Sequence, residues 1–156
     1  MKKVLSILVI ALFAIAMVSC SKVNDTEKLI IGQWQETEVI GTTTINGVTG
    51  EPESMLEPDE TTVITFKKDH TYSSLWTTDG GEVASKGTWS VQDNTLTMTS
   101  ESISTECNID ELDKNNMVLS YHESGVESGL SYSTLVVIKM KKIYSCKIRD
   151  SFFSRK

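Results

Sequence analysis

The sequence has few of the residues and patterns that carry chemistry, and little that would form helices. It contains only two histidines, His70 and His122, and neither has the Cys/His/Asp spacing of a zinc site. No serine lies in a G-x-S-x-G context, and no glycine-rich loop is present to hold a phosphate. Helical periodicity is almost absent after the first twenty residues. From these absences we expect no metal, no cofactor and no enzyme activity.

Basic residues are also scarce. The chain has 15 Lys and Arg against 21 Asp and Glu, a net charge of −6. The basic charge beyond Lys142 lies in the C-terminal tail, at Lys147, Arg149, Arg155 and Lys156, so the part before the tail is more acidic still. An acidic body repels phosphate backbones, and we therefore expect no nucleic-acid partner. Sugars, apolar ligands and basic proteins remain open as partners.

The longest apolar run, residues 4–18, follows Lys2 and Lys3 and is broken only by Ser6. About 15 residues are too few to span a bilayer and are typical of a signal-peptide core. The run ends in Met17-Val18-Ser19-Cys20, which resembles the lipobox of bacterial lipoproteins. An ordinary secretory signal or an uncleaved anchor are the alternatives, but the cysteine stands where the cleavage site must be.

The lipobox resemblance implies cleavage before Cys20 and acylation of that residue. Residues 1–19 would then be the signal peptide, and residues 20–26 the lipidated cysteine and a polar tether. Several acyl chains on one residue anchor a protein firmly to a membrane, whereas one chain is marginal. Ser21 rather than aspartate at the second position favours the outer membrane, by analogy with enterobacterial sorting; the leaflet stays open.

Two further cysteines, Cys107 and Cys146, remain for the folded part of the chain. In the oxidising cell envelope they could pair as a disulfide. The alternative is that both stay reduced, with Cys107 as a small core residue. Spacing alone does not decide between these.

The clearest structural pattern lies in residues 85–99. Trp89 and Val91 alternate with polar residues, and Leu96 and Met98 do so again after a short Asp93-Asn94 turn. Alternation on both sides of a short turn predicts an antiparallel hairpin with one buried face. The remaining chain repeats this pattern.

Further strands are expected at residues 35–40, 61–66, 71–77, 105–109, 117–121 and 130–140. About eight short strands with hairpin-like connections predict an all-β fold, a small antiparallel up-and-down barrel spanning residues 27–143, with a β-sandwich as the alternative. One helical turn is expected at residues 25–30.

Polar segments between these strands are predicted to be connections. Residues 41–59 form a long loop carrying a small hairpin at Asn46-Gly47, and residues 110–116 and 123–129 are shorter connections. Residues 144–156 lack alternation, which predicts either a short packed appendage or a disordered tail.

Several short motifs together resemble a known family. They are Gly32-Gln33-Trp34, Phe66-x-x-Asp69-x-Thr71-Tyr72, Gly87-Thr88-Trp89 with Leu96, and Ile109-x-x-Leu112 with Met117-Val118-Leu119. Their order and spacing over roughly residues 27–142 are similar to the lipocalin-like lipoproteins of Bacteroidetes. The resemblance implies a small eight-stranded barrel with no cofactor, and it supplies no catalytic residue. One departure is His70, where the family's turn usually has glycine.

Two groups of acidic and amide side chains are candidates for acid–base chemistry or cation binding. Glu36 and Glu38 are expected on one face of a strand, where paired carboxylates can perform acid–base chemistry, although a solvated strand face explains them better. A second cluster consists of Asn108, Asp110, Asp113 and Asn115. It lacks the glycine and the closing glutamate of a calcium loop, so we interpret it as turn-forming.

Aromatic residues on alternating positions give the best indication of a binding site. The candidate ligand-binding residues are Trp34, Phe66, Tyr72, Trp76, Trp89 and Tyr132. The alternative is that they simply fill the barrel, as side chains can in a barrel of about eight strands. Two functions follow. The first is a lipid-anchored envelope protein that binds a small hydrophobic or amphipathic ligand. The second is a structural or inhibitory protein that contacts a basic partner through acidic residues 51–60.

Overall fold

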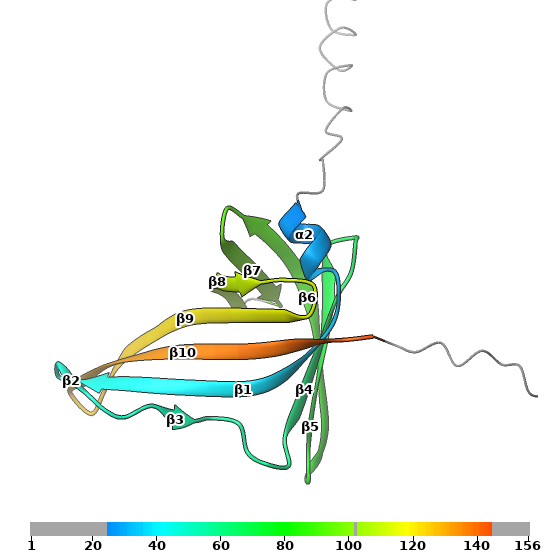
Figure 1. The fold of residues 1–156 in the computed structure, drawn as a ribbon. Coiled ribbons are helices and arrows are strands. Elements are labelled where there is room, and N and C mark those ends of the chain that lie inside the picture. The colour runs from blue at the N-terminus through cyan, green and yellow to red at the C-terminus, as the bar shows by residue number, and fades with distance from the viewer. Residues whose placement is uncertain (1–24, 102, 145–156) are drawn as a thin grey trace, which may run out of the picture.

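The computed structural model describes residues 25–101 and 103–144. It contains one short helix, α2 (Asp25–Ile30), followed by strands only (Figure 1). The strands are β1 (Gly32–Ile45), β2 (Val48–Thr49), β3 (Glu53–Ser54), β4 (Thr61–Phe66), β5 (Thr71–Thr78), β6 (Gly81–Gln92), β7 (Thr95–Ser100), β8 (Ile103–Leu112), β9 (Asn116–Glu127) and β10 (Leu130–Ile143). Residues 1–24, which include the expected signal peptide, Cys20 and most of the expected tether, lie outside the described residues, as do Cys146 and the rest of the expected tail from residue 145. None of the described helices is both long enough and apolar enough to cross a membrane.

The sheet closes on itself. Its order is β10-β9-β8-β7-β6-β5-β4-β1, and β10 pairs in turn with β1. Every neighbouring pair is antiparallel. The predicted all-β barrel of about eight strands is therefore confirmed, and the alternative β-sandwich is not what the chain forms.

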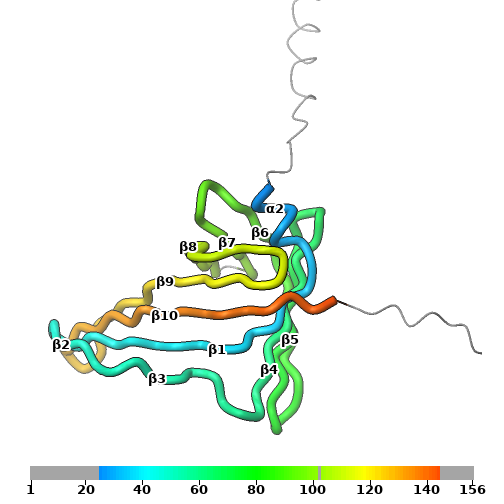
Figure 2. Tube along the Cα trace, viewed as in Figure 1, coloured from blue at the N-terminus to red at the C-terminus, as the bar shows by residue number. Residues whose placement is uncertain are grey.

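The barrel is tight at one end and splayed at the other. Beside α2, β1 pairs with β4 over residues 32–35 only; further along it pairs with β3 instead. On the other side, residues 121–127 of β9 pair with β10 alone. Figures 1 and 2 show β1, β9 and β10 running together, away from β4 and β5. We call the end beside α2 the closed end and the opposite end the open end.

The hairpins predicted from alternation are confirmed. Thr88 pairs with Thr99 and Gln92 with Thr95 around the Asp93-Asn94 turn. The Asn46-Gly47 turn joins Ile45 to its partner Val48 with both turn residues at positive φ, 49° and 84°, as a type I′ turn requires.

The turn before β5 accounts for the histidine where the family has glycine. His70 adopts φ 60°, a left-handed conformation that glycine enters without cost. The carboxylate of Asp69 accepts hydrogen bonds from the backbone N–H and the hydroxyl of Thr71, at 3.1 and 2.7 Å. The His70 ring packs beside Trp89 with 5.2 Å between centroids. These contacts hold the same turn without glycine.

Three expected connections are wrong in extent. Residues 41–45 belong to β1, residues 110–112 to β8 and residues 123–127 to β9. All three stretches are rich in polar residues because they lie near strand ends that solvent reaches, so burial does not impose apolar alternation there. The actual β9–β10 turn is only Ser128-Gly129, with φ 51° and 81°.

Candidate functional site

The closed end is filled by aromatic side chains. Phe66 lies 5.5 Å from Trp89 in an edge-to-face arrangement and 6.3 Å from Tyr72, measured between ring centroids. Trp34 is fully buried in the same cluster, together with Leu96, Met117 and Leu119. Four of the six candidate ligand residues, Trp34, Phe66, Tyr72 and Trp89, are thus brought together, and they form the core of the barrel.

The end of α2 is bound to this core through polar contacts. The Trp34 indole Nε1–H donates to the carbonyl of Ile30 at 2.6 Å. The Lys142 ammonium donates to the carbonyl of Leu29 at 2.6 Å and lies 4.8 Å from the centroid of the Trp34 ring. The last carbonyls of a helix lack partners within it, and these two donors supply them. The helix therefore acts as a fixed plug at the closed end.

The other two candidate ligand residues lie apart from the core and from each other. Trp76, on β5, points to the inner face opposite Thr62 but keeps 41% of its surface exposed. Tyr132, on β10, packs over Gly125 on β9 and lines a hollow of about 400 Å³ with Ile45 and Leu130. Both residues face the open end of the barrel, from different strands. The six candidates do not form one site.

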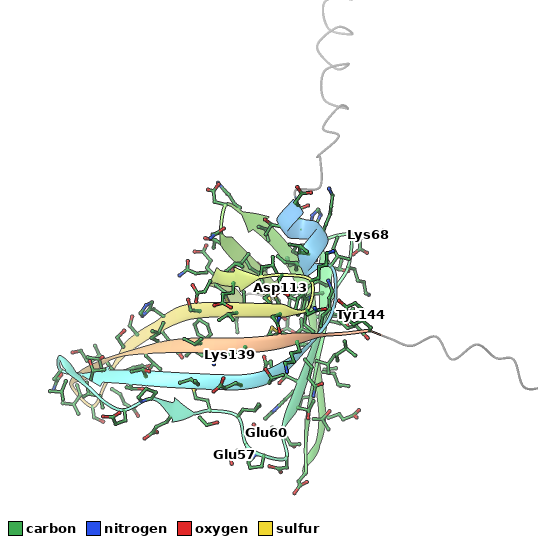
Figure 3. The ribbon with its side chains drawn as sticks, in the orientation of Figure 1. Glu57, Glu60, Lys68, Asp113, Lys139 and Tyr144 are labelled. Atoms are coloured by element: carbon green, nitrogen blue, oxygen red, sulfur yellow. The ribbon has the colours of Figure 1, made fainter. Side chains whose placement is uncertain are left out.

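A β-bulge at Thr37 separates the two acidic residues of β1. Glu36 lies opposite Met140, whereas Glu38 lies opposite Lys139, because the register shifts between them. Met140 is a core residue, so Glu36 faces the barrel interior. Glu38 points outward and forms a 2.6 Å salt bridge with Lys139, which Figure 3 labels on β10. The expectation that the two carboxylates share a face is therefore wrong.

Glu36 lies half-buried where β1 and β4 separate. Burial raises the pKa of its carboxyl group above the ordinary value, and a hydrogen bond with the Thr62 side chain lowers it by less. Tyr121, on β9, also has a raised pKa because of burial and the nearby charges of Glu123, Cys107 and Glu36. The polar groups of the interior thus gather just above the aromatic core.

Glu36 belongs to a row of side chains that crosses the inner face. Glu36 contacts Thr62 on β4, Thr62 lies opposite Trp76 on β5, and Trp76 lies opposite Val83 on β6. We call these four residues the inner row. Trp76 and Val83 leave 41% and 57% of their surfaces exposed, so the row combines a carboxylate, a hydroxyl and accessible apolar surface.

The outward side of the same strands carries a broad groove of about 1280 Å³. Its walls come from β4, β5 and β6 and are mostly threonine, serine and lysine, with Val63, Leu75 and Ala84 as the aliphatic members. Alternation along these strands sends Leu75 outward and Trp76 inward. The groove and the inner row therefore use opposite faces of the same sheet.

The raised pKa of Glu36 leads to a prediction about stability. Folding favours the protonated form of Glu36, because the pKa of its carboxyl group is higher in the folded protein than in the unfolded chain. The contribution of this group to the free energy of unfolding is complete below its pKa in the unfolded chain, near 4.5, and is lost as pH rises through its pKa in the folded protein. Glu36→Gln should therefore raise the thermal unfolding midpoint at about pH 7, and this gain should disappear at about pH 4. Glu38→Gln, which breaks a salt bridge with Lys139, is the control and should give no gain. An equal midpoint for wild type and Glu36→Gln at about pH 7 would contradict the assignment.

Cys107 is buried in the core, and burial raises the pKa of its thiol to about 11. Its proposed disulfide partner, Cys146, is outside the described residues. Among residues 25–101 and 103–144, no three or more His, Cys, Asp or Glu side chains are grouped so as to hold a metal ion.

A closed eight-stranded antiparallel barrel is the architecture of lipocalin-like proteins. The family model described as the lipocalin-like domain matches residues 30–119, and the chain belongs to this family. The resemblance drawn from the tryptophan, turn and strand motifs is thereby confirmed.

One solved structure supports the fold, and a second is reported beside it. A lipocalin-like protein from Bacteroides uniformis is similar at 12% identity and a TM-score of 0.50, over 73% of this chain and 98% of that one. An uncharacterized protein from Bacteroides eggerthii is similar at 13% identity and a TM-score of 0.45, over 73% and 99%. No curated protein matches the chain. At such low identity the likeness concerns the fold alone.

Proposed function

We propose that this protein is a lipid-anchored binding protein of the cell envelope that holds a small hydrophobic or amphipathic ligand at the open end of its barrel. The lipocalin-like barrel supports a ligand-binding role. The proposed role is binding rather than catalysis, because the bulge at Thr37 separates the one carboxylate pair considered for acid–base chemistry.

The observation that carries the proposal is the exposed apolar surface of the inner row. The closed end is filled, yet Trp76 and Val83 still present apolar surface on the inner face. An exposed tryptophan on an inner face costs free energy, roughly 25 cal/mol for each Å² of apolar surface left in water. A ligand that covers this surface recovers that free energy, and the polar groups of Glu36 and Thr62 would orient it.

The test is native mass spectrometry of the protein purified from its own host, with Trp76→Ala as the variant. The wild type should carry a small molecule, and the variant should lose most of it. Leu75→Ala is a matched control, because Leu75 immediately precedes Trp76 on β5, is 38% exposed and faces the outward groove. Loss of the bound molecule in Leu75→Ala but not in Trp76→Ala would contradict the proposed site.

The proposed membrane anchor consists of acyl chains on Cys20, which the lipobox resemblance implies. Asp25, the first residue of α2, is five positions after Cys20, so an extended chain spans at most about 17 Å between them. Acyl chains on Cys20 would therefore hold the closed end near the membrane and turn the open end away from it. We place the protein at the outer membrane because no aspartate follows Cys20.

Cys20→Ser tests the anchor. The variant should incorporate no labelled palmitate and should leave the membrane fraction, because the acylated residue is missing. Cys107→Ser is the control, since that thiol is buried in the barrel and should not affect labelling. Equal labelling of wild type and Cys20→Ser would show that the anchor is elsewhere.

The filled closed end also favours a second function, that of a protein-contacting envelope factor. Residues 51–60 include exposed Glu51, Glu53, Glu57 and Asp59, and Figure 3 labels Glu57 and Glu60 on the segment before β4. A basic partner would bind there with an affinity that falls steeply as salt is raised. Binding of a small apolar ligand would change little with salt, which distinguishes the two functions.

A further inference from the structure

We propose that the ligand of the inner row is an amphipathic molecule with a positively charged ammonium group, and that Glu36 together with Trp76 recognises this group. The inference rests on the proposed ligand-binding function and adds the chemical class of the ligand. It is argued from the isolation of Glu36, from its neighbours and from the charge of the barrel interior.

Glu36 faces the interior without a cation of its own. None of the salt bridges in the described parts of the chain involves it. Lys139 on β10 pairs with Glu38 on the outside, and Lys142 binds the end of α2. Lys141 is exposed and follows the inward-facing Met140, so it lies on the outer face of β10. A half-buried carboxylate without a cation is destabilising, and alternation from the buried Trp34 places Glu36 on the inner face, just before the β-bulge.

The neighbours of Glu36 suit an ammonium group rather than another carboxylate. The Thr62 hydroxyl hydrogen-bonds to the Glu36 carboxylate and leaves further acceptor positions free. Trp76 lies opposite Thr62 on the same face, and a tryptophan ring attracts cations over its π face. Val83, opposite Trp76, extends the row with apolar surface for the hydrocarbon part of the ligand.

The other titratable groups near Glu36 supply no positive charge. Burial raises the pKa values of Tyr121 on β9 and Cys107 on β8, so both stay uncharged near neutral pH, and Glu123 on β9 adds a further negative charge. An anionic head group placed here would be repelled, and a neutral one would gain only hydrogen bonds. A charge pair in a half-buried site favours the cation by about tenfold or more over a neutral head group.

The experiment compares three probes with the same hydrocarbon chain: octylammonium, 1-octanol and octanoate. Their dissociation constants for the purified protein are measured by calorimetry. Wild type should bind octylammonium about tenfold more tightly than 1-octanol, and octanoate least tightly. Glu36→Gln should abolish the preference for octylammonium over 1-octanol while leaving the affinity for 1-octanol within about twofold, because the apolar part of the row is intact.

Glu38→Gln is the matched control, because it removes the same charge two residues away but from the outward face. It should keep the preference for octylammonium, which rules out a general effect of the negative net charge. Binding of all three probes with equal affinity would overturn the ammonium inference and leave the binding function standing. A Glu36→Gln protein that still prefers octylammonium over 1-octanol would likewise overturn the ammonium inference and leave the binding function standing. Binding of none of the probes would overturn both.

Discussion

Replacing Trp34 with alanine is expected to lower the free energy of unfolding by about 3–5 kcal/mol. Trp34 is 0% exposed, so the substitution leaves a large cavity in the closed end. It also removes the hydrogen bond to the Ile30 carbonyl and the ring beneath Lys142, which together hold α2. Chemical denaturation followed by circular dichroism measures the change.

Trp76→Ala provides the comparison, since it removes the same side chain from the half-exposed inner row. It should lower the unfolding free energy by no more than about 1 kcal/mol, because most of the cost of a deletion comes from buried surface. Equal destabilisation by the two substitutions would show that the aromatic residues are not divided between a filled closed end and an accessible open end.

Gly87→Ala is the second substitution with a large expected effect. A methyl group at Gly87 would clash with the carbonyl oxygen of Thr99, an atom of the paired backbone of β7. It would also come within 2.9 Å of the Tyr72 ring. Because a backbone atom cannot rotate away, β6 and β7 must separate. We expect a loss of about 3 kcal/mol, at the upper end of what overpacking costs.

Gly80→Ala is the control for this substitution. Gly80 has no positive φ, and a methyl group there would meet only the Thr78 hydroxyl at an ordinary 3.5 Å. Its unfolding free energy should stay within about 0.5 kcal/mol of wild type. A Gly87→Ala protein as stable as Gly80→Ala would mean that β6 and β7 do not approach as closely as described.

The sequence predicts the hairpins well where one face of a strand is buried. Trp89, Val91, Leu96 and Met98 alternate because the core imposes a period of two, and Asn46-Gly47 marks its turn because few residues accept positive φ. Where both faces of a strand meet water, as in residues 123–127, nothing imposes the alternation. The sequence therefore predicts a loop where the chain forms the end of β9.

The site is harder to derive from sequence than the fold. Alternation places Trp34, Trp76 and Trp89 alike on the inner face, but it does not say where the strands separate and expose one of them. That depends on the limited pairing of β1 with β4, which is a long-range property. Alternation from Trp34 places Glu36 on the inner face, but the outward position of Glu38 depends on the bulge at Thr37, since one extra residue changes the face of every side chain after it.

The indole N–H signals of the three tryptophans report separately on the two ends of the barrel. The indole N–H of Trp34 donates to Ile30, and that of Trp89 donates to the Lys67 carbonyl at 3.1 Å. Both belong to the filled closed end. Trp76 alone of the three lies in the inner row, where the ligand is proposed to bind.

The most direct measurement is a titration of the ¹⁵N-labelled protein with octylammonium, followed through the three indole N–H resonances by NMR. A ligand in the inner row should shift the Trp76 resonance in a saturable manner and leave those of Trp34 and Trp89 in place. Shifts at Trp34 or Trp89 would show a ligand inside the closed end. Binding that leaves Trp76 unmoved would place it elsewhere, for example in the outward groove, and would contradict the central claim.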